Sequence, residues 1–393
     1  MVKKKNSKKA INKEIKQAPE EIANETSYID WKIPAAFVAG ILVTVLYFNL
    51  PVINPSAAIN TTIQTVPTLY ILNDANCALC DDAWIEPRVS QDFNVNVQRI
   101  DSSSAQGQQL ISTLGITSLP AAFLSSNFEN SSVFTNYTTQ GWVVKTGNYY
   151  LIRTQGVKDL TKQESSIPKV DLFVMSQCPY GTPAQTNMIN LKKTVPDFDL
   201  NIYYIVDVQT KSEMDSSLLQ YKLQYDAACA DATTSQSYGL SCTDEEWQTY
   251  NDSFTESCEL KSNNNYYCSL HGPAELKIDI EQICAKNISN NWGEFVLAQI
   301  ANNFNATIAA NASGIDYDEL MSCVNSSLGL ELLDANIAVA NNLAIGSSPT
   351  YIFDNVFTNP NQDPSTVICT LHPTLAGCEN IDSLELSTST GSC

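Results

Sequence analysis

Basic side chains are scarce in this chain, which has 22 lysines and arginines against 42 aspartates and glutamates and a formal net charge of -20. Eight of the 22 lie in residues 1–32, which leaves 14 for everything downstream. Because a nucleic-acid partner requires a basic face that neutralises phosphates, the charge balance argues against one. A solvated acidic surface that keeps an exported protein soluble is the simpler interpretation.

Charge of either sign is missing from residues 33–52, which read IPAAFVAGILVTVLYFNLPV. A helix of roughly 20 residues, at about 1.5 Å per residue, crosses a hydrocarbon core of about 30 Å. Trp31, Tyr47 and Phe48 lie near its ends, where aromatic rings favour the headgroup region. A cleaved signal peptide is the alternative, with Ala57 and Ala58 as a possible cleavage site. The long lysine-rich lead favours a retained transmembrane anchor.

Lysine and arginine are absent from residues 33–87, whereas eight lysines precede the apolar segment. Positive residues stay on the cytoplasmic side, so we expect a cytoplasmic tail (1–32), a single-pass signal anchor in the cell membrane (33–52) and a short tether (53–65). Everything beyond is expected to lie outside the cytoplasm. All 12 cysteines lie there, as disulfide formation in an oxidising compartment predicts. Eight Asn-X-Ser/Thr sequons are consistent with a glycoprotein and lie at Asn60, Asn130, Asn136, Asn251, Asn287, Asn305, Asn311 and Asn325.

A strand, a CxxC motif and a helix are expected in succession after the tether. Residues 66–72 are apolar and β-branched and predict a buried strand. The motif Cys77-Ala78-Leu79-Cys80 comes next, followed by a predicted helix over 81–91 with a kink at Pro87. Further strands are predicted at 95–100 and 121–124, a helix at 105–114, and one or two antiparallel strands within 133–152.

This order, over residues 66–160, resembles the thioredoxin fold, in which a cis-proline faces the CxxC. The resemblance assigns that place, and contact with substrate, to Pro120. A cysteine at a helix amino terminus has a lowered pKa, so Cys77 is the expected nucleophile and Cys80 the residue that resolves the mixed disulfide. The alternatives are a permanent disulfide or half of a zinc site. Zinc is short of ligands, because the only histidines are His271 and His372 and no second CxxC exists.

The same plan recurs further along with one cysteine missing. Residues 170–175 predict a strand, Cys178-Pro179-Tyr180-Gly181 follows, and a helix begins near residue 183. A strand is predicted at 200–208, and residues 345–353 repeat the loop, proline and strand found at 116–124. Between them lies a long insertion with helical patterns at 244–258, 274–285, 292–304, 317–323 and 328–343.

The segments MSQCPYGTPAQ, SLHGPAELKIDIEQICAKN and IGSSPTYIF resemble an exported thioredoxin-like family of archaea and bacteria. That family is related in plan to Dsb-type oxidoreductases and more distantly to gamma-interferon-inducible lysosomal thiol reductases. The resemblance implies a thioredoxin core with a helical insertion over residues 168–385. It places Cys178 at the active-site position and makes Pro349 the cis-proline that contacts substrate. The expected fold class is therefore α/β, with two thioredoxin-like domains in tandem.

Gly181 stands where a second active-site cysteine is expected, and a single cysteine cannot release its own mixed disulfide. Cys178 could act as a one-cysteine isomerase-like or substrate-trapping site, pair structurally with a distant cysteine, or be vestigial. Cys393 could be free, and His271 is more easily explained as a helix-start residue than as a base. Eight further cysteines are expected to be structural, with pairs Cys258–Cys268 and Cys369–Cys378 favoured by proximity: Cys229, Cys242, Cys258, Cys268, Cys284, Cys323, Cys369 and Cys378.

The leading hypothesis is a membrane-anchored thiol–disulfide oxidoreductase that acts on exported proteins with thiols or disulfides. Its expected partner is a quinone-linked membrane protein resembling vitamin K epoxide reductase, and no cofactor is expected. The direction of electron flow is open, because Ala78 and Leu79 contribute no charge. The rivals are a cell-surface binding or scaffold protein with degenerate thioredoxin folds, and a carrier that holds a metal between Cys77 and Cys80.

Overall fold

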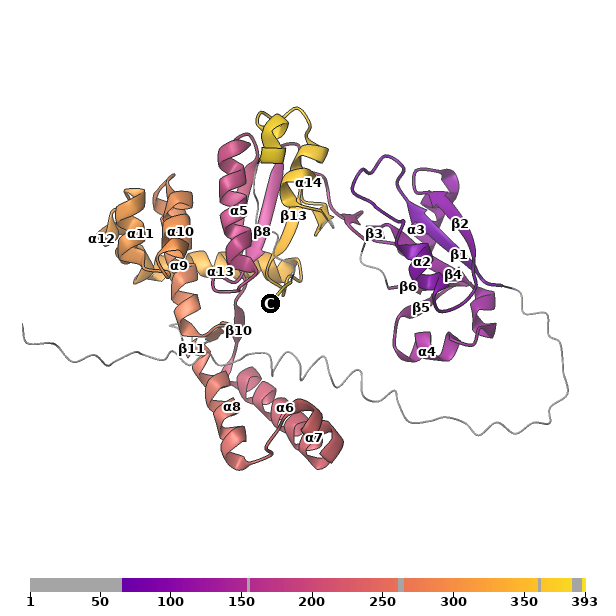
Figure 1. The fold of residues 1–393 in the computed structure, drawn as a ribbon, viewed down its shortest axis with the longest axis horizontal. Helices are drawn as coiled ribbons and strands as arrows, with labels where there is room; N and C mark the ends of the chain where they lie inside the picture. Colours follow the sequence, from indigo (N-terminus) through magenta and orange to yellow (C-terminus); the bar gives the residue numbers. More distant parts are fainter. Residues whose placement is uncertain (1–65, 154–155, 261–264, 360–361, 384–390) are drawn as a thin grey trace, which may run out of the picture. The chain divides into compact units, whose positions relative to one another are not determined.

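The structure is a computed structural model that describes residues 66–153, 156–260, 265–359, 362–383 and 391–393 (Figure 1). Its contacts separate two compact units. The described part of the larger unit lies within residues 66–225 and 243–393, and that of the smaller unit is residues 226–242. No helix among the described residues has the length and apolar character needed to cross a membrane. The predicted span, residues 33–52, lies outside them.

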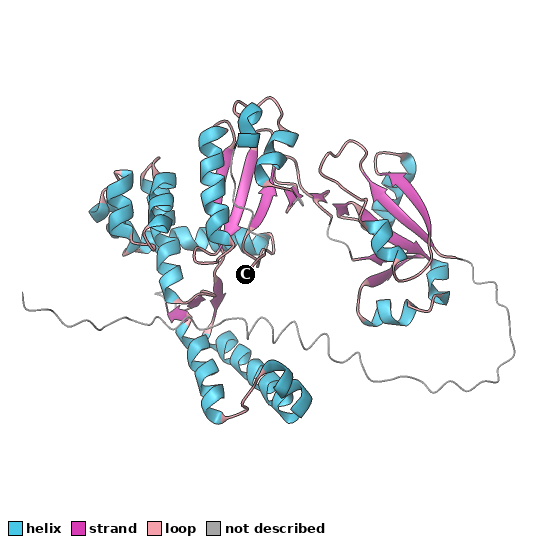
Figure 2. Ribbon diagram, in the orientation of Figure 1, coloured by secondary structure: helices cyan, strands magenta, loops and turns pink. Residues whose placement is uncertain are grey.

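Residues 66–160, the first region, contain strands and short helices (Figure 2). In chain order they are β1 (Thr68–Asn73), α2 (Ile85–Ser90), β2 (Asn96–Asp101), α3 (Ala105–Leu114), β3 (Ser118–Leu119), β4 (Ala121–Ser125), the 3-10 helix η1 (Ser126–Asn130), α4 (Phe134–Thr139), β5 (Val143–Thr146), β6 (Tyr149–Ile152) and β7 (Lys158–Asp159). The predicted strands and the helix at 105–114 are confirmed, with ends that move by one or two residues at most.

One predicted element of the first region needs correction. The helix after the CxxC begins at Ile85 rather than at residue 81, so Pro87 lies in its first turn. Backbone N–H groups there have no helical partner, so proline is tolerated without a kink. The prediction of one or two antiparallel strands within 133–152 is confirmed by the hairpin β5–β6. Helix α4 precedes it, with Phe134 and Tyr137 packed on the same hydrophobic cluster, and is an addition to the predicted set.

The five strands of the first sheet lie in the order β2-β1-β4-β6-β5. Strand β1 is parallel to β2 on one side and antiparallel to β4 on the other, and β4 is antiparallel to β6. Leu69, Ile71 and Leu72 of β1 are fully buried, because hydrophobic clusters cover both faces of the sheet. The order and directions of β2, β1 and β4 are consistent with the thioredoxin-like fold that the sequence predicts.

The second region contains β8 (Lys169–Val174), α5 (Gly181–Thr194), β9 (Asp199–Tyr204), β13 (Thr350–Phe353), β14 (Phe357–Thr358), α14 (Pro364–Leu371) and the 3-10 helix η2 (Cys378–Ser383). Strand β8 is parallel to β9 and antiparallel to β13, which pairs with β14. The short strands β7 and β3 extend this sheet beyond β14, in the order β3-β7-β14-β13-β8-β9. The internal repeat is thus seen in three strands, since β9-β8-β13 matches β2-β1-β4. The fourth strand differs, because β14 directly follows β13 in the chain, whereas β4 pairs with β6 and not with β5.

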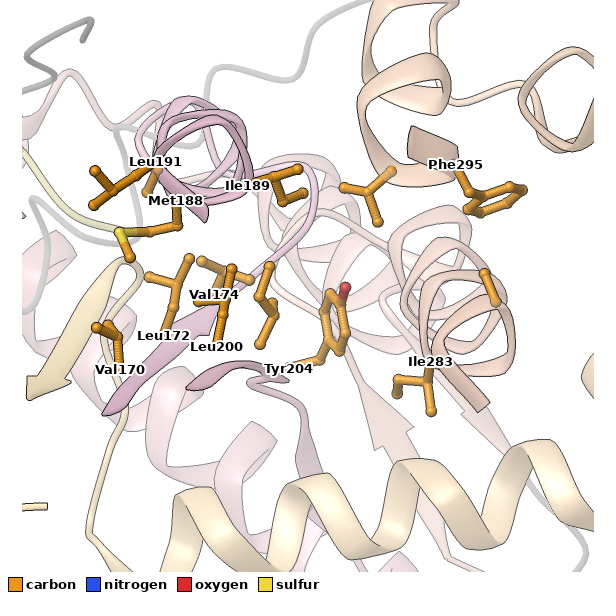
Figure 3. Close-up of a cluster of buried hydrophobic side chains, with 14 of the residues drawn as sticks. Val170, Leu172, Val174, Met188, Ile189, Leu191, Leu200, Tyr204, Ile283 and Phe295 are labelled. Atoms are coloured by element: carbon orange, nitrogen blue, oxygen red, sulfur yellow. The ribbon is translucent and has the colours of Figure 1, made fainter. Parts of the chain in front are cut away.

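The core of the second region lies between its sheet and helix α5 (Figure 3). Val170, Leu172 and Val174 alternate along β8 and point toward Met188 and Leu191 of α5, and each of these side chains is fully buried. Alternation with a period of two places these strand residues on one face. The helix thereby covers the face of the sheet that its apolar stripe matches.

The long insertion between β9 and β13 is mostly helical, as predicted. Its elements are β10 (Asp207–Gln209), α6 (Lys211–Ala230), α7 (Ala232–Tyr238), α8 (Asp244–Glu256), β11 (Cys258–Leu260), β12 (Tyr266–Cys268), α9 (Pro273–Ile288), α10 (Trp292–Ala301), α11 (Ala306–Ser313), α12 (Tyr317–Val324) and α13 (Ser327–Asn342). Helices α6, α7 and α11 and the three-stranded sheet β10-β12-β11 are additions to the predicted set.

Buried amides join the insertion to the thioredoxin-like core. Gln282 of α9 accepts hydrogen bonds from Gln185 of α5 (3.0 Å) and from the hydroxyl of Tyr204 on β9 (2.6 Å). It donates to Gln299 of α10 (2.9 Å), which in turn donates to Glu281 (2.7 Å). Because buried polar groups cost free energy unless they are paired, this chain of bonds fixes how α9 and α10 pack on the core.

Four disulfides lie away from the two predicted active-site positions. The pairs predicted from proximity, Cys258–Cys268 and Cys369–Cys378, are confirmed. Cys229–Cys242 and Cys284–Cys323 complete the set that was expected to be structural.

Candidate thiol–disulfide sites

The CxxC of the first region lies in a loop that begins where strand β1 ends. The Cys77 N–H donates to Asp74 O (3.0 Å) and the Cys80 N–H donates to Cys77 O (3.2 Å), so the loop folds into consecutive turns. The Asn73 side chain donates to Cys80 O (2.6 Å) and holds the end of the motif against the sheet. Cys77 and Cys80 form a disulfide with Cα atoms 5.3 Å apart.

The two cysteines differ in exposure. Cys77 is half-buried, whereas Cys80 is 5% exposed and packs in one cluster with Leu119 and Ala121, the residues on either side of Pro120. The Leu119–Pro120 peptide bond is cis, as the thioredoxin resemblance implies. The structure therefore brings Cys77, Cys80 and the Pro120 loop together, with the first sulfur closer to solvent than the second.

The electrostatic surroundings of Cys77 differ from the expectation. Because α2 begins only at Ile85, Cys77 does not lie at a helix amino terminus. Asp74, Asp81 and Asp82 flank the motif in the sequence, and Lys158 forms an ion pair with Asp74 (3.1 Å). A carboxylate near a thiol opposes its ionisation, whereas a helix amino terminus promotes it. The helix amino terminus that was expected to activate Cys77 is therefore absent from this position.

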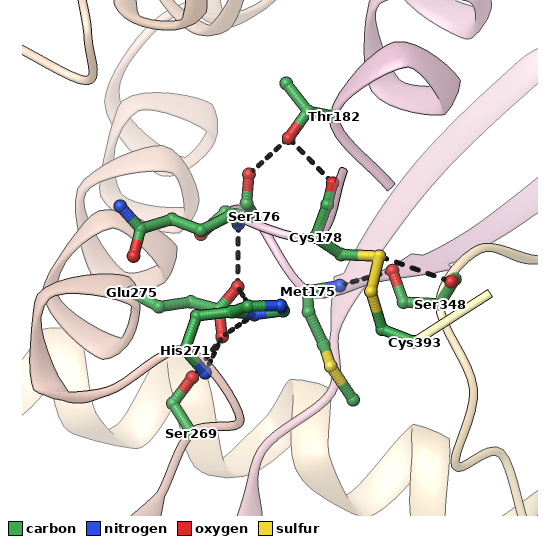
Figure 4. A network of polar contacts seen from close by, with 10 residues as sticks. Met175, Ser176, Cys178, Thr182, Ser269, His271, Glu275, Ser348 and Cys393 are labelled. Carbon is green, nitrogen blue, oxygen red and sulfur yellow. Dashed lines mark hydrogen bonds and ion pairs between the residues drawn. A yellow bond between two sulfur atoms is a disulfide. The ribbon is translucent and has the colours of Figure 1, made fainter. Parts of the chain in front are cut away.

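Cys178 of the second region occupies the corresponding place between β8 and α5. It is fully buried, and its N–H donates to Met175 O (3.1 Å). The Thr182 hydroxyl donates to the carbonyls of Ser176 (2.8 Å) and Cys178 (3.0 Å) and closes the turn that leads into the helix (Figure 4). The Ser348–Pro349 peptide bond is cis, again as the resemblance implies.

Gly181 is the first residue of α5 and has no room for a side chain. A Cβ there would lie 2.4 Å from Ser348 Oγ, 2.8 Å from Met175 O and 3.3 Å from Cys178 Cβ. Ser348 Oγ is fixed in that place because it accepts a hydrogen bond from the buried Met175 N–H (2.9 Å). The missing cysteine is therefore excluded by the packing around this turn.

Cys178 instead forms a disulfide with Cys393, 215 residues further along the sequence. This corrects the expectation that Cys393 is free and selects, among the alternatives for Cys178, pairing with a distant cysteine. All 12 cysteines are bonded. Spacing alone could not reveal this pair, because the sequence between its members contains no signal of their proximity.

A buried carboxylate, Glu275 of α9, lies below the Cys178 turn (Figure 4). It accepts hydrogen bonds from the Gln177 N–H (2.6 Å) and from the Ser269 hydroxyl. His271 Nδ1 is 3.0 Å from both Glu275 oxygens, and His271 directly precedes the N-cap Gly272 of α9. The prediction of His271 as a helix-start residue agrees with this position. Sequence reasoning missed Glu275, which lies in a helical pattern of ordinary appearance.

One turn further along α9, Asp279 is fully buried beside Glu275. Burial raises the pKa of the Asp279 carboxyl well above its usual value, and the negative charge of Glu275 raises it further. Burial also raises the pKa of the neighbouring Tyr204 hydroxyl. Both shifts favour the protonated form of the Asp279 carboxyl over the carboxylate.

Comparison with known proteins adds little to this geometry. No protein-family model and no curated protein sequence matches the chain. Among solved structures, a provisionally assigned protein-disulfide isomerase from Pseudomonas syringae is 10% identical, covers 53% of this chain and 94% of its own, and has a TM-score of 0.30. Another from Nitrosomonas europaea is 11% identical, covers 53% and 97%, and has the same TM-score. Similarity at this level carries no argument about function.

Proposed function

We propose that this chain is a membrane-anchored thiol–disulfide oxidoreductase that acts outside the cytoplasm on exported proteins, through Cys77 and Cys80. The observation that carries the proposal is the pairing of a half-buried Cys77 with a buried Cys80 beside the Pro120 loop. A disulfide with one accessible sulfur and one shielded sulfur directs incoming thiolates to a single atom. The membrane anchor and the quinone-linked membrane partner also belong to the proposal, and they rest on the sequence and its family resemblance alone.

The exchange has two steps. In the reducing direction the Cys77 thiolate attacks a substrate disulfide, forms a mixed disulfide and releases one substrate thiolate. The Cys80 thiolate then attacks Cys77 Sγ, releases the second substrate thiolate and restores the Cys77–Cys80 disulfide. The reverse sequence oxidises a substrate dithiol. Pro120 is assigned to contact with the substrate backbone, since its loop packs with both cysteines.

The test uses the full chain with Cys178→Ser/Cys393→Ser in detergent, so that the Cys77–Cys80 disulfide is measured by itself, with dithiothreitol as electron donor and insulin as the disulfide substrate. We expect Cys77→Ser in this chain to lower the rate of insulin reduction at least tenfold, toward the rate with dithiothreitol alone. When the Cys80→Ser chain is reduced, desalted and mixed with insulin without dithiothreitol, a mixed disulfide at Cys77 should accumulate, which non-reducing mass spectrometry detects. The matched control is Cys369→Ser/Cys378→Ser in the same chain, which removes another short-range disulfide and should keep the rate. Equal rates with and without Cys77→Ser would refute the proposal.

The scaffold alternative is favoured by one contact. Leu79, between the two cysteines, is 3% exposed and packs in a cluster that also includes Val157. If this packing closes the loop permanently, Cys77 and Cys80 will stay unlabelled by a thiol reagent after mild reduction. Labelling of both at low dithiothreitol would exclude the scaffold function. In cells, an unchanged redox state of Cys77 after deletion of the quinone-linked protein would remove that partner from the proposal.

A further inference from the structure

Residues 391–393 lie against the Cys178 turn, where Cys393 pairs with the backbone of Ser348. The Cys393 N–H donates to Ser348 O (2.9 Å), and the Ser348 N–H donates to Cys393 O (3.2 Å). Two residues that exchange both hydrogen bonds are a hydrogen-bonded pair of an antiparallel ladder. An extended segment that adds to an exposed backbone in this way is a recurring form of peptide recognition. The segment thus uses backbone groups that any extended peptide can offer.

Gly391 also fits its place closely. A Cβ there would lie 2.4 Å from two ring atoms of Tyr180, and the residue has a φ of +152°. Both the close approach and the backbone conformation favour glycine. Cys393 packs on the hydrophobic cluster that contains Cys178, Met175 and Ile352. Backbone pairing, ring contact and apolar packing therefore act together on three residues.

We propose that Cys178 and Cys393 form a second thiol–disulfide exchange centre, in which Cys393 is the resolving cysteine. Residues 391–393 occupy the place of the substrate, whose class is an extended peptide segment with one cysteine. Cys393 thus provides the second thiol, in place of a cysteine at position 181. This second centre shares no cysteine with the Cys77–Cys80 centre, so the proposal does not depend on the function proposed for Cys77 and Cys80.

The reaction balances with a dithiol as the reductant. Cys393 is the expected target of the dithiol, because it is half-buried whereas Cys178 is fully buried. One thiolate of the dithiol attacks Cys393 Sγ and releases the Cys178 thiolate. The second thiolate then attacks the dithiol sulfur bound to Cys393, which releases the Cys393 thiolate and leaves the oxidised dithiol. The Cys178 thiolate then attacks a peptide disulfide and releases one peptide thiolate, which takes a proton from water. The Cys393 thiolate attacks Cys178 Sγ, releases the second peptide thiolate and restores the Cys178–Cys393 bond. The peptide disulfide gains two electrons and the centre loses two.

The experiment uses the full chain with Cys77→Ser/Cys80→Ser, so that the first centre cannot contribute. The probe is a synthetic octapeptide with one central cysteine, supplied as its disulfide-linked dimer. With Cys393 present, the dithiothreitol-reduced and desalted chain should release two peptide thiols and keep no adduct. With Cys393→Ser added, it should release one thiol and retain the peptide on Cys178. Cys378→Ser frees the half-buried Cys369 in the same manner and should retain at least tenfold less peptide.

Retention of the peptide to the same extent in the Cys393→Ser and Cys378→Ser chains would overturn the proposal, as would a stable adduct when Cys393 is present. N-methylation of the peptide cysteine removes the donor to Ser348 O and should slow adduct formation about fivefold, the equivalent of about 1 kcal/mol for one hydrogen bond. An unchanged rate would refute the backbone pairing.

A second measurement covers the case in which a variant fails to fold. In the chain with all its cysteines, thiol labelling after graded reduction should modify Cys178 and Cys393 at a dithiothreitol concentration at least tenfold lower than the concentration that Cys284 and Cys323 require. The latter pair is a buried structural disulfide. The opposite order would show that Cys178–Cys393 is structural and would overturn the exchange centre.

Discussion

Restoring a side chain at position 181 should damage the second region rather than complete a CxxC. In Gly181→Ala the new Cβ meets Ser348 Oγ at 2.4 Å and Met175 O at 2.8 Å. Moving Ser348 leaves the buried Met175 N–H without its acceptor, which costs about 1–3 kcal/mol. The backbone shift away from Met175 O costs about 1–3 kcal/mol more, as for other overpacked sites. Better helix propensity returns up to about 1 kcal/mol.

The net destabilisation expected for Gly181→Ala is therefore about 1–6 kcal/mol, with a midpoint of about 3 kcal/mol. For a region of this size each kcal/mol lowers Tm by about 2–4 °C, so calorimetry of the full chain should show one transition lowered by about 6–12 °C at that midpoint. Ser348→Ala alone should cost about 1–3 kcal/mol through the lost hydrogen bond. The double variant should cost less than the sum, because its first clash is removed in advance.

Two results would refute this reasoning. Gly181→Ala with the Tm of the unaltered chain would show that the turn accommodates a side chain. Strict additivity with Ser348→Ala would show that the two residues do not compete for the same space. In either case packing would no longer explain why position 181 has no cysteine. The structural reason for using Cys393 as the second thiol would then be lost as well.

Two further predictions concern helix α9. Cys284→Ser/Cys323→Ser opens a disulfide that spans 39 residues, so calorimetry should show a loss of about 4 kcal/mol from the greater entropy of the unfolded chain, and an unchanged Tm would contradict this. Asp279→Asn should raise Tm at pH 7, with a gain that shrinks toward pH 4. The raised pKa of Asp279 means that its stabilising protonation is complete below about pH 4 and is lost as pH rises through the folded-state pKa. A gain that is independent of pH would contradict the assigned cause.

The strand–cysteine–helix plan of both regions could be predicted because buried strands such as β1 and β8 consist mostly of apolar residues. The helix at 105–114 was predictable to the residue, since Ser104 caps its start and Gly115, with a φ of 62°, ends it. Local signals of this kind act within a few residues. They do not depend on what packs against the element.

The features that the sequence did not predict lack such clear local signals. Residues 81–84 lack helix because carboxylate side chains satisfy nearby backbone N–H groups, as Asp81 does for Ala83, and such turns compete with a helix. Helix α6 shows no clear apolar stripe, so periodicity gives no warning of it. The Cys178–Cys393 bond depends on Ser348, which meets both cysteines only after the second sheet has formed. Long-range pairings of this type carry no sequence-local trace.

The reciprocal hydrogen bonds between Ser348 and Cys393 have a kinetic consequence for any visiting peptide. In the reduced chain the competitor is covalently tethered, and tethered segments act at effective concentrations in the millimolar range. A freely diffusing peptide present at micromolar levels must then displace a rival that is about a thousandfold more abundant at the site. Polypeptides that are also bound elsewhere on the chain escape this handicap. The Cys178–Cys393 centre would thus select peptides by their proximity as well as by their sequence.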